Sequence, residues 1–232
     1  MYLTGDFHGD PRQLSSKNFP EGKTLTKDIV IQLGDFGLYF YENDKEAEHY
    51  LDWLSEKTFT FAFIRGNHDN KDLIEKNVKY IKKWGNTVGE IKRKHGVVYY
   101  LPAGVYEIQN KKVLVIPGAT SHDKHLRTEW VDWWSNETLS YDETEKIINE
   151  LNENDWKVDV VLGHTCPASI AYQFYDGPPN HCSVSQFMDY IEERLDFKEW
   201  HFGHFHNGRE FQRDDDSEYY KCHYKEVEEL RL

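Results

Sequence analysis

Short apolar runs alternate with polar turns along much of the chain. Four β-rich runs each lead into a polar turn that contains glycine: Tyr2–Thr4, Asp28–Leu33, Phe59–Ile64 and Val158–Leu162. Because these runs are continuously apolar rather than alternating, they indicate strands that are buried on both faces. The pattern therefore predicts a sheet that is covered by other layers.

Amphipathic segments lie between these runs and predict helices. Capping signals mark four expected helix starts: Asn43 with Glu46, Ser140 with Glu143, Ser183 with Gln186, and Asp10 followed by Pro11. A side chain that accepts from the first-turn amides, with Glu or Gln three residues later, is typical of a helix start, and Pro fits the first turn. Strands that alternate with helices indicate an α/β protein.

Three strand-like runs follow one another in the middle of the chain: Val97–Tyr100, Val105–Ile108 and Val113–Ile116. Turn residues lie between these runs, with Gly104 before the second and Asn110 between the second and the third. We therefore expect a second, more antiparallel sheet. No Pro/Ser-rich linker and no internal repeat interrupts the chain, so we expect one domain over residues 1–232.

Residues 71–94 are the positively charged part of the sequence, with eight Lys or Arg against three acids. Ile74, Val78 and Ile81 lie at helical spacing, so we favour a helix whose lysines face solvent. A basic face beside the functional site, suited to a polyanionic substrate, is the alternative.

Composition narrows the class of protein. The chain is 38% hydrophobic and 15% aromatic, which excludes an intrinsically disordered protein. Its 232 residues are enough to bury a hydrophobic core. The formal net charge of −13 argues against an extended grip on nucleic acid, which needs Lys and Arg to neutralise phosphates. Anionic substrates remain accessible if metal ions supply the positive charge.

The cysteines and the apolar runs bear on the compartment. No run approaches the ~20 residues that span a bilayer, and the first residues lack the pattern of a secretory signal. Three scattered cysteines do not form a disulfide framework. Cys166, His181 and Cys182 lack a fourth ligand at zinc-finger spacing, so buried thiols are favoured over zinc. We expect a cytoplasmic protein that contacts no membrane.

Polar side chains that bind metals follow the predicted strands. Carboxylate, amide and imidazole groups occur in these turns without a thiolate: Asp6, His8, Asp35, Asn67, His164, His204 and His206. Because strand carboxyl ends share one edge of an open α/β sheet, we expect these groups to meet there. Such a set suits Mn, Fe, Zn or Ni, and it is too large for one ion unless a carboxylate bridges two. Glycine before these residues permits a sharp turn and close approach.

These residues carry a resemblance that covers most of the chain. Asp6-x-His8, Gly34-Asp35, Gly66-Asn67-His68-Asp69, Gly163-His164 and Gly203-His204-x-His206 resemble the five motifs of the calcineurin-like metallophosphoesterase superfamily. The resemblance implies a four-layer α/β-β/α sandwich of two mixed sheets flanked by helices. It also implies a metal-dependent phosphoric ester hydrolase with two divalent ions, Mn being favoured and Fe, Zn or Ni the alternatives.

The resemblance implies a role for each motif residue. Asp6, His8 and His206 would hold one ion, Asp35 would bridge, and Asn67, His164 and His204 would complete the second ion's shell. His68 would donate a proton to the leaving oxygen, with Asp69 as its orienting partner. Arg65 and Asn67 would meet the phosphoryl charge, and a metal-activated hydroxide would attack phosphorus.

The substrate is less sharply defined. The protein Ser/Thr phosphatase branch continues Gly-Asp with a second Asp and then Arg-Gly, whereas Phe36 and Gly37 follow Asp35 here. We therefore expect a small-molecule or nucleotide phosphomonoester or phosphodiester. A nuclease, a protein phosphatase or a catalytically silent binding module is the alternative. The sequence does not indicate an oligomeric state.

Two further segments have open interpretations. In residues 117–134, Asp123, Lys124 and Arg127 either touch the phosphate or lie on an ordinary surface loop. The neighbouring tryptophans either stack a nucleobase or cap the core: Trp130, Trp133 and Trp134. The acidic run Asp214–Asp216 predicts a solvated turn.

Overall fold

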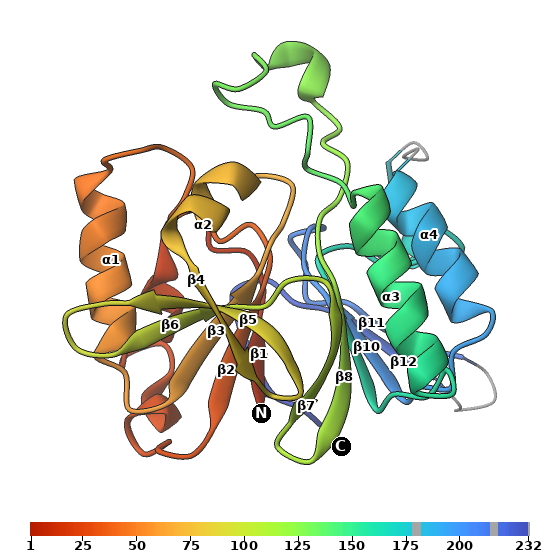
Figure 1. Cartoon of the computed structure of the whole chain (residues 1–232), viewed down its shortest axis with the longest axis horizontal. Helices are drawn as coiled ribbons and strands as arrows, with labels where there is room; N and C mark the ends of the chain where they lie inside the picture. Colours follow the sequence, from red (N-terminus) through yellow and green to blue (C-terminus); the bar gives the residue numbers. More distant parts are fainter. Residues whose placement is uncertain (178–181, 214–217, 232) are drawn as a thin grey trace.

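The computed structural model describes residues 1–177, 182–213 and 218–231, and their strands form two mixed sheets (Figure 1). The first sheet has the order β13-β1-β2-β3-β6-β5-β4, with β1 Tyr2–Thr4, β2 Ile29–Leu33, β3 Thr60–Ile64, β4 Lys79–Lys83, β5 Asn86–Lys92, β6 Val97–Tyr100 and β13 Val227–Glu229. The second has the order β11-β12-β10-β9-β8-β7, with β7 Gly104–Ile108, β8 Lys111–Ile116, β9 Val160–Gly163, β10 Glu199–Phe202, β11 Glu210–Gln212 and β12 Tyr219–Cys222.

Each sheet has a parallel centre and antiparallel edges. Strands β1, β2, β3 and β6 pair in parallel in the first sheet, and β8, β9, β10 and β12 do so in the second. The carboxyl ends of parallel strands lie at one edge. The polar turns after β1, β2 and β3, and those after β9 and β10, therefore lie along one edge of each sheet.

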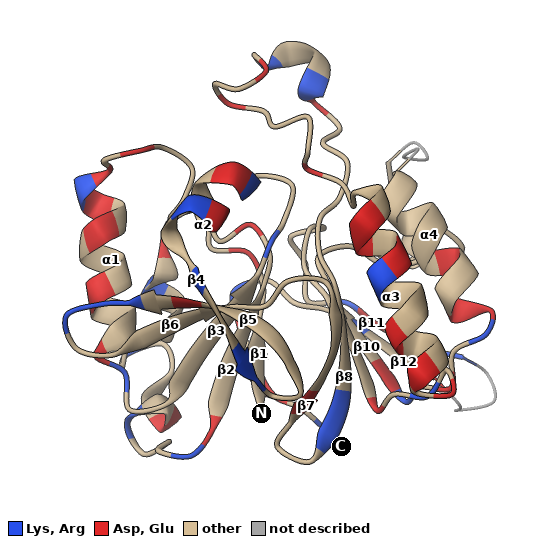
Figure 2. Cartoon of the chain, viewed as in Figure 1, with Lys and Arg blue, Asp and Glu red and all other residues tan. Residues whose placement is uncertain are grey.

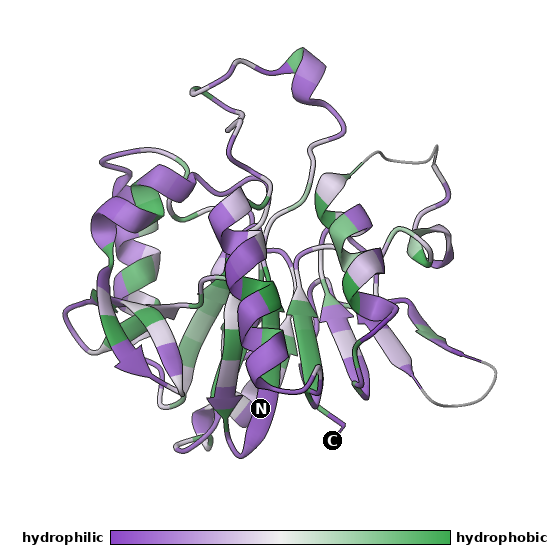
Figure 3. Cartoon of the chain, turned by 45° about the vertical axis from the view of Figure 1, so that its right-hand side comes forward, coloured by the Kyte–Doolittle hydropathy of each residue, from purple (hydrophilic) through white to green (hydrophobic). Residues whose placement is uncertain are grey.

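The α-helices of the described residues cover the outer faces of the sheets: α1 Lys45–Ser55, α2 Lys71–Asn77, α3 Tyr141–Glu153 and α4 Ser183–Glu192. One apolar cluster, containing Leu51 and Phe61, joins α1 and α2 to the first sheet. A second joins α3 and α4 to the second sheet. A third, including Leu3 and Val115, lies between the sheets. Figure 3 shows the apolar colouring on the central strands. The four-layer α/β-β/α sandwich is thus confirmed.

The helix starts agree with the sequence only in part. Ser140 and Glu143 form the predicted capping box of α3. Helix α1 is capped by Asp44, which accepts from two first-turn amides, so the prediction of Asn43 was wrong by one residue. Helix α4 begins at Ser183 itself, with no side-chain cap at the residue before it, so that capping box was also wrong. The Asp10 cap is confirmed, although it starts a 3₁₀ turn rather than a longer helix.

The middle of the chain corrects two predictions. Strand β6 pairs in parallel with β3 in the first sheet, whereas we expected it in the second. The expected helix stops at Asn77, and β4 and β5 follow as an antiparallel hairpin. Trp84 and Gly85 at its tip both have positive φ, the geometry of a two-residue hairpin turn. This turn overrides the helical spacing of Ile81.

Acidic residues outnumber basic residues on two of the outer helices. Figure 2 shows Asp and Glu along α1 and α3. Among the described helices, none is long and apolar enough to cross a membrane. Cys166, Cys182 and Cys222 are buried free thiols. His181 and the run Asp214–Asp216 lie outside the described residues.

Candidate metal centre

The seven predicted ligands gather at the carboxyl edge of both sheets. Asp6 and His8 follow β1, Asp35 follows β2 and Asn67 follows β3. From the second sheet come His164, after β9, and two histidines after β10, His204 and His206. Residues as much as 198 positions apart are in contact, as in the pair His8 and His206.

Four of these residues form a first group. The side chains of Asp6, His8, Asp35 and His206 each offer one ligand atom, and these atoms all lie within 4.8 Å of one another. His206 Nε2 lies 2.9 Å from Asp6 Oδ2 and 2.9 Å from His8 Nε2. His8 Nε2 lies 3.8 Å from Asp35 Oδ2. Two carboxylates and two imidazoles therefore converge on one point.

A second group forms on the other oxygen of Asp35. His164 Nε2 lies 3.3 Å from Asp35 Oδ1 and 3.0 Å from Asn67 Oδ1. His164 Nδ1 lies 2.8 Å from the Leu33 carbonyl oxygen, which can only accept, so Nε2 is the atom turned toward the centre. The ring of His204 packs edge-on against His164, with centroids 5.0 Å apart. Asp35 thus presents one oxygen to each group.

Charge in this buried edge is concentrated on Asp35. Burial alone would raise the pKa of Asp35, but His164, His68 and His8 outweigh burial and hold the pKa below its ordinary value. Burial of His164 would lower its pKa, yet the Asp35 carboxylate raises it to about 10. Burial lowers the pKa of His204 well below its usual value, so this ring is neutral and ready to ligate.

The backbone at this edge adopts an unusual conformation. His8, Asp35, His204 and His206 have φ of 47°, 53°, 68° and 51°, in the left-handed region that residues with a Cβ avoid. A glycine also serves close approach, because a Cβ on Gly66 would lie 2.1 Å from Asp35 Oδ1. Such strain is characteristic of functional sites, where the surrounding structure enforces it.

The donor set fits divalent metal ions. Asp6 Oδ2 is a buried carboxylate oxygen that accepts no hydrogen bond from the described residues, although it faces the His206 ring. Oxygen and imidazole donors without a thiolate suit Mn, Fe, Zn or Ni. A divalent cation held by the first group would satisfy Asp6 Oδ2.

The two predicted catalytic residues occupy different environments. The His68 backbone amide donates to Asp35 Oδ1 at 2.8 Å, and its ring borders a cleft beside His8 and His206. Asp69 is buried and accepts from the backbone amides of three turn residues: Phe36, Gly37 and Gly66. Among the described residues, no hydrogen bond joins the Asp69 carboxylate to the His68 ring. Asp69 instead ties the turn after β2 to the turn after β3.

The predicted phosphate-binding arginines are placed differently from each other. Arg127 borders the same cleft as His68, and its guanidinium donates to Asp123 Oδ2 at 2.7 Å. Arg65 is fully buried, and its guanidinium donates to backbone carbonyls of the loop that follows β8: Asn136, Glu137 and Thr138. The Arg65 guanidinium therefore lies against this loop, and Arg65 is not among the described residues that line the cleft.

Replacing Arg65 with Ala is expected to destabilise the fold. The change leaves buried carbonyls without donors and weakens the anchoring of Glu143, so we expect the free energy of unfolding to fall by about 3 kcal/mol. Denaturant unfolding measures the change. Arg209, which forms an exposed ion pair with Asp176, provides the control, because Arg209→Ala should change the free energy of unfolding little. Wild-type stability in the Arg65 variant would contradict this assignment.

The loop of residues 117–140 projects beyond the sheets in Figure 1. Trp134 is buried against Phe40, with ring centroids 5.3 Å apart, which favours its capping role, whereas Trp130 is largely exposed. Lys124 is exposed on the short 3₁₀ turn Lys124–Leu126. The loop also supplies two residues near the candidate ligands that the sequence did not predict: Ser121 and Glu137.

Ser121 joins the candidate ligand Asn67 to a buried carboxylate. Asn67 Nδ2 donates to Ser121 Oγ at 2.9 Å. The Ser121 hydroxyl and backbone amide both donate to the carboxylate of Glu137, which is 2% exposed. Ser121 lies shortly after β8, so its position after a strand could have marked it as a candidate site residue. Glu137 lies in an irregular loop, where no sequence pattern marks it.

The fold and the site together define a class of protein. Carboxylate and imidazole donors converging at the carboxyl edge of two facing sheets are typical of a metal-dependent hydrolase. A family model described as calcineurin-like phosphoesterase matches residues 1–208. The chain belongs to the calcineurin-like phosphoesterase family, and it is a metal-dependent phosphoester hydrolase.

Comparisons with individual proteins add little beyond the family. Solved structures that are similar to the chain include a phosphopantetheinyl hydrolase from Mycobacterium tuberculosis, with 16% sequence identity and a TM-score of 0.44. The match covers 97% of this chain and 89% of that chain. Among curated proteins, no sequence matches the chain.

Proposed function

We propose that this protein hydrolyses a phosphomonoester or phosphodiester of a small molecule or nucleotide with two divalent ions, as one catalytic domain in the cytoplasm. The observation that carries the proposal is the position of Asp35, whose two oxygens face two separate groups of ligand atoms. When bound, such ions supply Lewis-acid charge to phosphoryl oxygens and lower the pKa of water.

The residues divide between the two ions by their place around Asp35. Asp6, His8 and His206 would hold one ion, with Asp35 shared. The second would take Asp35 with Asn67, His164 and His204. Mn²⁺ is our first choice, although Fe, Zn and Ni accept the same donors.

The cleft beside the first group holds the residues for proton transfer and charge. His68 lies there, and its imidazole is suited to protonate the leaving oxygen. Arg127 borders the same cleft and would meet phosphoryl charge. Asp69 acts as a positioning residue, because it holds the turns that carry Asp35 and His68.

Ser121 and Glu137 would set the orientation of the Asn67 amide. A carboxylate only accepts, so the Ser121 hydroxyl must donate its hydrogen to Glu137. Ser121 Oγ then has only lone pairs for Asn67, which must present its NH₂ to Ser121. The Asn67 oxygen is thereby turned toward His164 and the second ion's place.

Replacing Ser121 with Ala is expected to weaken metal binding. Loss of an outer-shell partner typically costs about 10- to 100-fold in metal affinity. Calorimetric titration of the metal-free protein with Mn²⁺ measures the change in affinity for the second ion. Ser135→Ala, an exposed serine of the same loop, is the control. Unchanged Mn²⁺ affinity in the Ser121 variant would contradict this orienting role.

The proposed function is tested by metal analysis and a substrate panel. Purified protein should bind close to two equivalents of Mn²⁺ and lose phosphoesterase activity when a chelator removes them. The panel comprises phosphomonoesters, phosphodiesters, cyclic nucleotides and dinucleoside polyphosphates, with Mn²⁺ added. Stoichiometric metal binding without hydrolysis of any ester would favour the silent binding module.

The nuclease alternative finds less support. Acidic residues outnumber basic residues on α1 and α3, which disfavours an extended polyanion (Figure 2). Cleavage of DNA or RNA with a steep salt dependence would overturn the small-molecule assignment.

A further inference from the structure

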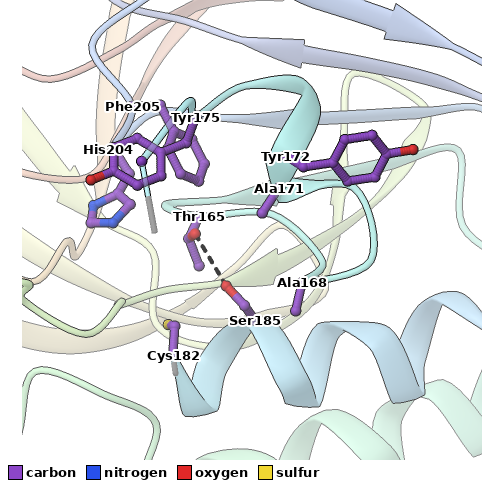
Figure 4. A pocket seen from close by; sticks show the side chains of 10 residues that line it. Thr165, Ala168, Ala171, Tyr172, Tyr175, Cys182, Ser185, His204 and Phe205 are labelled. Atoms are coloured by element: carbon purple, nitrogen blue, oxygen red, sulfur yellow. Dashed lines mark hydrogen bonds between the residues drawn. The ribbon is translucent and has the colours of Figure 1, made fainter. Parts of the chain in front are cut away.

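A hollow of about 230 Å³ lies beside the candidate metal centre, apart from the cleft that holds His68 (Figure 4). Aromatic side chains, Tyr175 and Phe205, lie at one end of it. Thr165 and Ser185 supply hydroxyls, and Ala168 lines it without filling it. The residues that line this hollow are mainly apolar, and none is charged among those described.

The hollow adjoins the ligands of the second group. His204 itself lines the hollow, while its ring packs against that of His164. Thr165 directly follows His164 in the chain, and Phe205 stands between His204 and His206. The hollow therefore borders the second group of candidate ligands through His204.

The shape and lining of the hollow favour a flat ring with polar edges. The Tyr175 ring packs against Phe205 and His122, with centroid distances of 6.1 Å and 5.3 Å. Tyr175 is nevertheless 36% exposed, and this exposed part can contact a ligand. The buried hydroxyls of Thr165 and Ser185 lie 3.3 Å apart, and each retains hydrogen-bonding capacity for a heteroatom.

The size limits the group that fits. Sites that enclose a whole small ligand measure about 300–1,000 Å³. At about 230 Å³ the hollow holds one ring system rather than a complete substrate. The absence of charged side chains among its described residues disfavours a second phosphate there.

We infer that this hollow binds the flat heterocycle of a nucleotide-like phosphoester whose phosphate is cleaved at the neighbouring centre. The inference rests on the proposed function for the phosphate, but ring binding stands on the hollow alone. It narrows the substrate class from phosphate esters in general to those that carry a base-sized ring.

Nucleoside binding tests the inference without relying on catalysis. Calorimetric titration of the Mn²⁺-supplemented protein with adenosine, uridine and ribose should show binding of at least one nucleoside but not of ribose. Tyr175→Ala removes the stacking surface and Ala168→Phe fills the hollow, so each should weaken nucleoside binding roughly tenfold. Tyr190→Ala, a comparably exposed tyrosine on α4, is the matched control.

The outcomes separate this inference from the proposed function. Absence of nucleoside binding, or equal affinity in wild type and in a folded variant of each hollow residue, overturns the inference. Adenosine binding alone identifies a purine, and uridine binding identifies a smaller ring; both support it. If the protein hydrolyses glycerol phosphate but binds neither nucleoside, the proposed function holds and the inference of a ring site is overturned. If it binds a nucleoside through these residues but hydrolyses no ester, the ring site holds and the proposed function is overturned.

Discussion

Asp35→Asn is expected to release metal from both groups and to abolish hydrolysis. The substitution keeps the size of the side chain but removes the negative charge that faces His8 on one side and His164 on the other. Because one residue serves both groups, the loss of affinity should exceed the about 10- to 100-fold typical of an outer-shell change. Metal content by plasma emission spectroscopy, with turnover of p-nitrophenyl phosphate, measures both effects.

The control for Asp35→Asn is a carboxylate outside the site. Asp52 pairs with Arg93 on the outer helix α1, so Asp52→Asn should retain metal and turnover. If Asp35→Asn kept its full metal content, the bridging role of Asp35 would be refuted.

His68→Ala is expected to lower kcat by roughly 10²- to 10⁴-fold while leaving metal content unchanged. Only the imidazole is lost, because the contact between this residue and Asp35 is made by the backbone amide, which alanine retains. The two variants therefore give opposite metal results for the same loss of activity. Metal analysis beside steady-state kinetics distinguishes them.

The leaving group provides a sharper test of the role of His68. A proton donor matters least when the leaving oxygen is a weak base, so the loss should be smaller for p-nitrophenyl phosphate than for an alkyl phosphate. His95→Ala, which removes a surface histidine paired with Glu56, should affect neither substrate. An equal loss for both esters would point to a positioning role for His68 instead of proton donation.

The convergence of the candidate ligands at one edge could be predicted because each of them follows a strand of a largely parallel sheet. Asn67 and His164 are 97 residues apart, yet both stand at the carboxyl ends of strands whose apolar sequence marks them as central. Parallel pairing then places their turns at one edge. Local sequence was sufficient there because topology rather than side-chain packing brings the groups together.

Other features depend on packing that local sequence does not record. Arg65 precedes Gly66 like a phosphate-binding residue, but its destination was decided by the carbonyls of a loop about 70 residues later. Glu137 gained its role through contact with Ser121 across an irregular loop. The β4–β5 hairpin was missed because the positive φ of Trp84 is not a preference of tryptophan. In each case a tertiary contact or turn geometry outweighed the local pattern.

The left-handed backbone at His8, Asp35, His204 and His206 also bears on how this protein would respond to selection for heat resistance. Each non-glycine residue held in this conformation costs about 1 kcal/mol or more, whereas glycine adopts it without a steric penalty. At the exposed positions His8 and His206, glycine substitutions would relieve strain and remove donors at once. Variants enriched by a thermal screen would therefore include proteins that melt later and catalyse nothing, and only a parallel activity screen would separate them from useful ones.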